Sequence, residues 1–102
     1  MKIIVVTSCA TGIAHTFVAA EAISRAGKAA GHEVFVETQG AGSYKPLAQE
    51  VIDSADVVIF ANDVAIRDAD RFASSKIVQS IPKTAIKDAK SLIEEAEIRA
   101  RS

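Results

Sequence analysis

The only cysteine of the sequence, Cys9, stands in a polar segment whose composition suits the binding of an anion. Residues 9–16 read CATGIAHT and separate the apolar run Ile3–Val6 from a segment with helical spacing. The first amides of a helix lack internal hydrogen-bond partners and carry the positive end of the helix dipole, so they bind phosphate and favour a thiolate. A free cysteine is more often a small buried core residue. The polar surroundings of Cys9 instead predict a nucleophile beside a phosphate site.

The residues after Cys9 supply the groups that a phosphate-binding loop needs. Gly12 can adopt a positive φ and turn backbone amides inward, and Thr11 and Thr16 offer hydroxyl donors. For His15 two interpretations stay open, a phosphate partner or a solvated helix residue, because a cation near a helix N-terminus is unfavourable without an anion beside it. The predicted phosphate-binding loop consists of Ala10, Thr11, Gly12, Ile13, Ala14, His15 and Thr16.

Other phosphate-binding motifs are absent from the sequence. It contains no G-x-x-x-x-G-K-[ST] nucleotide loop and no G-x-G-x-x-G dinucleotide turn. Low-mass phosphatases of similar layout need C-x-x-x-x-x-R, but His15 stands where that pattern has the arginine whose planar fork clamps the phosphoryl oxygens. A site that holds phosphate on sulfur without hydrolysing it therefore fits better. A phosphatase or arsenate reductase, and a non-catalytic module that binds flavin or another phosphate ligand, are the alternatives.

Segments rich in Val, Ile and Phe alternate with segments of helical spacing, which predicts an α/β protein. The expected strands are Lys2–Val6, Glu33–Thr38, Val57–Ala61 and Lys76–Ser80. The expected helices are a long one from Ile13 that Gly31 stops, a short one at Leu47–Ser54, a turn at Asp68–Phe72, and a last one that follows Pro82 and includes Ile86, Ala89, Ile93, Ala96 and Ala100.

This order predicts one domain, residues 1–102, with a three-layer, flavodoxin-like fold. Its four-stranded parallel sheet has the order 2-1-3-4 and helices on both faces. The strand Glu33–Thr38 alternates Val with Phe and Glu, which is typical of a less buried edge strand. The site should lie where the strand order reverses, so the loops Thr7–Gly12 and Ala61–Ile66 should form it.

Three polar residues flank this predicted site. Asn62 and Asp63 follow the third strand, and Gln39 ends the second strand on the other side of the first. Each could support the phosphate-binding loop or dock a partner. A helix or turn cap is the favoured role for Asp63, and a turn role is equally open for Gln39.

Composition excludes several classes of function. The net charge is −1 and only five of the 102 residues are Phe or Tyr, with no Trp, so neither a basic phosphate-binding surface nor a base-stacking platform for nucleic acid is expected. A single cysteine rules out a disulfide within the chain and a Cys-x-x-Cys zinc site. The N-terminal segment is too polar to span a membrane. We expect a soluble, cytoplasmic protein.

The sequence resembles the fructose-family IIB component of the sugar phosphotransferase system. The resemblance rests on the block CATGIAHTF from Cys9, followed by AAEA from Ala19, and on GHEV, VETQG, ADVVI and RF further along the chain. These blocks keep the family order and extend to about Ile77. The Cys-x-Thr-Gly-Ile-Ala-His-Thr block is highly specific. Ala10 stands where the family usually has Pro.

The resemblance implies a role in sugar uptake. Cys9 would accept a phosphoryl group from a phosphohistidine of the IIA component and pass it to fructose, or a related sugar, held by the membrane IIC component. It implies no metal, no nucleotide and no other cofactor for this subunit, and a cytoplasmic location at the inner face of the membrane through IIC. It leaves open whether the chain is a separate subunit or a domain of a larger one.

Overall fold

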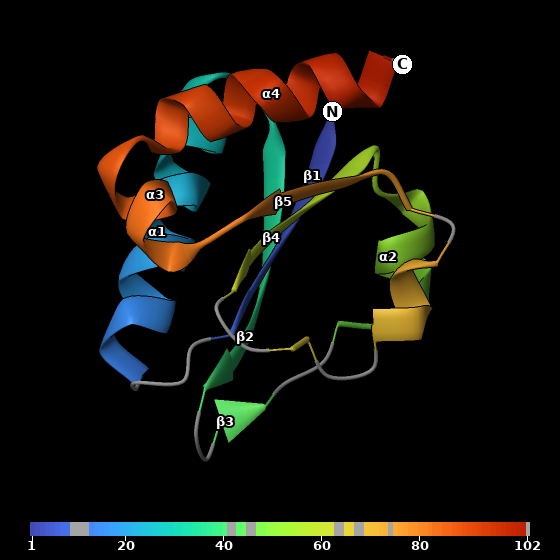
Figure 1. Cartoon of the computed structure of the whole chain (residues 1–102). Coiled ribbons are helices and arrows are strands. Elements are labelled where there is room, and N and C mark those ends of the chain that lie inside the picture. Colours follow the sequence, from blue (N-terminus) through green and yellow to red (C-terminus); the bar gives the residue numbers. More distant parts are fainter. Residues whose placement is uncertain are drawn as a thin grey trace.

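The computed structural model describes residues 1–8, 13–40, 43–44, 47–62, 65–66, 69–73 and 75–101, with the side chains of 13–17, 40, 43–44 and 82 excepted. The strands are β1 (Lys2–Ser8), β2 (Glu33–Gly40), β3 (Ser43–Tyr44), β4 (Val57–Asn62) and β5 (Ile77–Ser80). The helices are α1 (Ile13–Ala29), α2 (Gln49–Ser54), the 3-10 turn η1 (Ala69–Phe72), α3 (Pro82–Lys87) and α4 (Ala89–Arg101). Figure 1 shows their arrangement.

The strands form one sheet of order β3-β2-β1-β4-β5. The pairs β2–β1, β1–β4 and β4–β5 are parallel, so the predicted 2-1-3-4 order of four parallel strands is confirmed. The short β3 was not predicted. It pairs antiparallel with the end of β2, through Gln39–Tyr44 and Gly40–Ser43. Two residues carry no periodic apolar pattern, so the sequence gives no signal for such a strand.

Helices cover both faces of the sheet, as expected, but unequally. Helices α1, α3 and α4 lie on one face, and the short α2 and η1 lie on the other (Figure 1). Because side chains alternate along a strand, the uninterrupted run of β1 serves both cores. Ile3 and Val5 belong to the α1–α4 side, whereas Ile4 and Val6 pack with Phe72 on the α2 side.

A Schellman motif ends α1 at the predicted glycine. Gly31 has a φ of 88°, its N–H bonds to the carbonyl of Lys28, and the N–H of His32 bonds to the carbonyl of Gly27. Gly27 itself is required by close packing, because a Cβ there would lie 2.6 Å from Cγ2 of Val34. The apolar spacing of α1 thus includes a glycine at the point where the helix crosses β2.

The prediction of a single last helix was wrong, because the structure has two helices there, α3 and α4. The chain breaks at Asp88, whose φ of −147° and ψ of 62° are not helical. Its carboxylate accepts hydrogen bonds from the backbone N–H and the hydroxyl of Ser91, so it caps α4. The break shifts the apolar register: Ala85 is buried in α3, whereas Ile86 is 40% exposed.

The prediction that β2 is a less buried edge strand was wrong at its carboxyl end. Glu37 is completely buried, and β3 continues the sheet beyond Gln39. Glu37 does not face solvent but belongs to a buried ion pair with Arg71. Within the part of the chain that the structure describes, no helix is long and apolar enough to cross a membrane.

Candidate functional site

The structure describes both sides of the predicted phosphate-binding loop, but not the whole loop. Cys9, Ala10, Thr11 and Gly12 lie outside the described residues, as does Asp63. Ile13, Ala14, His15 and Thr16 form the first turn of α1, and their side chains are not among those described. Strand β1 ends at Ser8, the residue before Cys9, and α1 begins at Ile13. The roles of these residues therefore stay predictions.

Gln39 and Asn62 lie on either side of the end of β1. Ser8 is paired with Asn62 of β4, and its hydroxyl donates to the carbonyl oxygen of Gln39 on β2 at 3.3 Å. The side-chain amide of Gln39 donates to Glu37 at 2.6 Å, and the Oδ1 of Asn62 accepts from Nε2 of Gln79 at 2.6 Å. Hydrogen bonds thus hold both Gln39 and Asn62 in place at the carboxyl edge of the sheet, beside the end of β1.

Sequence reasoning missed the ion pair of Glu37 with Arg71. Nη1 of Arg71 donates to Oε1 of Glu37 at 2.9 Å, and Nη2 donates to Oε2 at 2.8 Å. The same carboxylate accepts from Nε2 of Gln39 and, at 2.9 Å, from the backbone N–H of Leu47. The Glu37 side chain is 0% exposed and that of Arg71 is 18% exposed. Through Arg71 and the Leu47 N–H, the carboxylate of Glu37 therefore holds η1 and the residues before α2 against β2.

These contacts control the ionisation of Glu37. Burial by itself raises the pKa of a carboxyl, but the hydrogen bonds from Arg71, Leu47 and Gln39, and the charge of the guanidinium, outweigh it and hold the pKa of Glu37 below its ordinary value. The carboxylate is thus charged at neutral pH. An acid that directly follows the apolar residues Val34–Val36 inside a strand is the sequence signal that could have found the pair, because a buried carboxylate needs a cation.

Arg71 is itself fixed on three sides. Its guanidinium carbon lies 4.9 Å from the centroid of the Phe72 ring, and its carbonyl accepts from the amide of Gln49 at 3.3 Å. Phe72 in turn meets Phe60 of β4 edge-on, with ring centroids 5.3 Å apart. The ion pair is therefore continuous with the core on the α2 side of the sheet.

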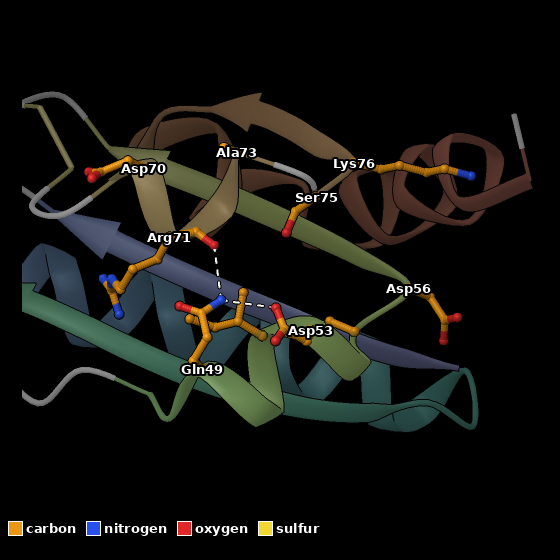
Figure 2. A pocket seen from close by; sticks show the side chains of 10 residues that line it. Gln49, Asp53, Asp56, Asp70, Arg71, Ala73, Ser75 and Lys76 are labelled. Carbon is orange, nitrogen blue, oxygen red and sulfur yellow. Dashed lines mark hydrogen bonds between the residues drawn. The ribbon is translucent and has the colours of Figure 1, made fainter.

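A cavity of about 400 Å³ lies between α2, η1 and the start of β5 (Figure 2). The amide of Gln49 crosses it, donating to Asp53 at 2.9 Å as well as to Arg71. Asp53, Asp56 and Asp70 line the cavity. Three carboxylates disfavour a phosphoryl group, and the guanidinium of Arg71 is committed to Glu37. The cavity does not offer the anion site that the sequence predicts.

Thr7 differs from the other polar residues at this edge of the sheet. It is 0% exposed, and among the described residues its hydroxyl has no hydrogen-bond partner. Ser8, its neighbour, is also buried but donates to Gln39. No group of three or more His, Cys, Asp or Glu residues within the described ranges could hold a metal ion.

Comparisons with known proteins agree with the fold described above. Residues 4–95 match the family model of the lactose/cellobiose-specific IIB subunit of the PTS, the sugar phosphotransferase system. The chain is 45% identical over 97 residues to the PTS system fructose-like EIIB component 2 of Escherichia coli K12, covering 94% of this chain and 92% of that one. It is 46% identical over 96 residues to the fructose-specific EIIB'BC component of Xanthomonas campestris, covering 93% of this chain and 16% of that protein.

A solved structure extends the agreement to three dimensions. It is a domain of the fructose-specific IIABC component of Borrelia burgdorferi, which matches with a TM-score of 0.88 and 38% identity. The match covers 93% of this chain and 91% of that domain. Strand order, helix placement and sequence thus point to the same relatives.

Proposed function

The chain belongs to the IIB components of sugar phosphotransferase systems, and on that premise we propose that Cys9 carries the phosphoryl group in a fructose-type system. The observation that carries this proposal is the place of the only cysteine. It directly follows Ser8, the last residue of the central strand β1, and α1 begins four residues later. The free amides at the start of a helix favour an anion, so they would favour the thiolate of a cysteine in this place.

The proposed reaction has two displacements. The thiolate of Cys9 attacks the phosphorus of a phosphohistidine on the IIA component, so that an S–P bond forms and the N–P bond breaks, and the released imidazole takes up a proton. A hydroxyl oxygen of the sugar then attacks the same phosphorus. The S–P bond breaks, the thiolate is restored, and the hydroxyl proton passes to a base. Backbone amides of residues 10–16 would hold the dianion between the two steps.

The partners follow from the system to which the family belongs. The fused B and C parts in the name of the Xanthomonas relative support a handover to a membrane IIC component, and the IIABC name of the solved domain supports a IIA donor. The sugar is fructose or a related one and is held by IIC. The subunit would work in the cytoplasm, at the inner face of the membrane. A cysteine phosphatase has weaker support, because the family model and the curated relatives are IIB components.

Phosphorylation of the purified chain tests this proposal. We expect the chain to accept a phosphoryl group from phosphoenolpyruvate through the general phosphotransfer proteins and a fructose-type IIA, and to release none to water in a phosphatase assay. Omitting IIA is the matched control. Rapid hydrolysis of p-nitrophenyl phosphate by the chain alone would favour the phosphatase instead.

A further inference from the structure

The hydroxyl of Thr7 is a buried polar group without a visible purpose in the fold. Thr7 is the last but one residue of β1, paired with Thr38 of β2 and Ala61 of β4. It has the same parity along β1 as Ile3 and Val5, so it faces the core beneath α1. Its hydroxyl is unpartnered among the described residues. A valine would fill the same space without stranding a donor.

An unpaired buried hydroxyl is costly, and native proteins seldom keep one without a ligand, a water or a function. The place of Thr7 favours a ligand. One residue separates Thr7 from Cys9, and two residues of chain span at most about 7 Å, so the two side chains can meet. The face of β1 that carries Thr7 is the face that α1 covers.

We infer that Thr7 is a further catalytic residue, whose hydroxyl donates a hydrogen bond to the anion carried at Cys9. This inference rests on the proposed function. Before transfer the anion is the thiolate, and after transfer it is the phosphoryl group. The donor therefore stabilises both charged forms, and either one would give the buried hydroxyl the partner that it lacks among the described residues.

Thr7→Val tests this inference, because it removes the hydroxyl and nearly preserves the shape. We expect phosphoryl acceptance to slow at least about tenfold, as for loss of one donor to a developing anion. The thiol pKa of Cys9, titrated by ultraviolet absorbance, should rise. The urea midpoint should stay the same or rise, because a buried unsatisfied donor is gone. A merely structural role would leave the thiol pKa and the transfer rate unchanged.

Two comparisons isolate the hydroxyl. Thr38→Val makes the same change on the neighbouring strand, where Thr38 is partly exposed, and should leave the thiol pKa and the transfer rate unchanged. Thr7→Ser and Thr7→Ala differ only in the hydroxyl, so the serine variant should transfer at least about tenfold faster than the alanine variant. This second pair decides the question if the valine variant does not fold.

The experiments distinguish a failure of the proposed function from a failure of the role of Thr7. A wild-type chain that accepts no phosphoryl group would overturn the proposed function, and this inference with it. A wild-type chain that accepts phosphate, with Thr7→Val transferring at the same rate or showing an unchanged thiol pKa, would overturn only the role of Thr7.

Discussion

Arg71 of η1 holds Glu37 of β2 by two parallel hydrogen bonds of 2.9 and 2.8 Å, across a sequence separation of 34 residues. The same carboxylate accepts from Gln39, whose carbonyl oxygen receives the hydroxyl of Ser8. A chain of hydrogen bonds thus runs from η1 through β2 to the last residue of the strand that precedes Cys9. The pair fixes the carboxyl edge of the sheet, where the phosphate-binding loop is predicted.

Removing the cation should destabilise the fold strongly. Arg71→Met leaves the carboxylate of Glu37 buried without its counterion, which costs about 3 kcal/mol of the free energy of unfolding. Urea unfolding at neutral pH measures it. The double variant Glu37→Leu/Arg71→Met is the matched control and should recover part of the loss, because it buries no charge but takes an acceptor from the Leu47 N–H and the Gln39 amide. A double variant no more stable than Arg71→Met would show that the pair is not the source of the effect.

Glu37 should also make stability depend on pH in the acid range. Its pKa is lower in the folded chain than in the unfolded chain, so the unfolded state binds the proton more readily. The contribution of Glu37 to stability is present above its ordinary pKa and is lost as the pH falls through the lowered value. Unfolding free energies measured between about pH 5 and pH 3 should fall less steeply for Glu37→Gln than for the wild-type chain. Equal slopes would contradict the assignment.

Gly27 should resist the substitution that a helix normally favours. Alanine in a helix interior gains about 1 kcal/mol over glycine, but here its Cβ meets Val34 at 2.6 Å, and overpacking costs about 1–3 kcal/mol. We expect Gly27→Ala to lower the free energy of unfolding by about 1 kcal/mol. Adding Val34→Ala should cost less in this background than in the wild type. Additive effects of the two substitutions would refute the steric explanation.

The cap of α4 should be a modest and local source of stability. Asp88→Ala removes the acceptor of the Ser91 N–H and hydroxyl, and the loss of an N-cap costs about 1 kcal/mol. Asp88→Asn keeps an acceptor and is the matched control, with an expected loss of only a few tenths of a kcal/mol. Chemical denaturation of both variants checks the order. Equal losses would mean that the cap contributes nothing.

The sequence predicts the four parallel strands and α1 well, because long apolar runs and a glycine stop are local signals. It does not predict the break at Asp88, since the apolar spacing continues past it and the new helix is fixed by the carboxylate of Asp88, which accepts hydrogen bonds from Ser91. The sequence does not predict the Glu37–Arg71 ion pair either, for another reason. The pair joins residues that are 34 positions apart and that only the fold brings together, whereas the alternating pattern of β2 alone predicts an exposed Glu37.

In the candidate site, too, the sequence predicts the local features and misses contacts that only the fold makes. The sequence predicts a nucleophile and its loop, from Cys9 to Thr16, because the residue types and their order there are specific in themselves. It raises Gln39 as a possible support but does not indicate its contacts. The hydroxyl of Ser8, 31 residues away, donates to the carbonyl oxygen of Gln39, and the amide of Gln39 donates to the carboxylate of Glu37. Nor does it single out Thr7, whose distinction is a hydrogen bond that it lacks among the described residues.

The measurement that tests the central claim most directly is the location of the phosphoryl group. The chain is phosphorylated from phosphoenolpyruvate through the general proteins and IIA, digested, and its peptides are analysed by mass spectrometry, beside Cys9→Ser treated in the same way. We predict the phosphoryl group on the peptide that contains Cys9, and none on the serine variant, whose fold by circular dichroism should be unchanged. Phosphate on another residue of the wild-type chain, or full phosphorylation of Cys9→Ser, would contradict it.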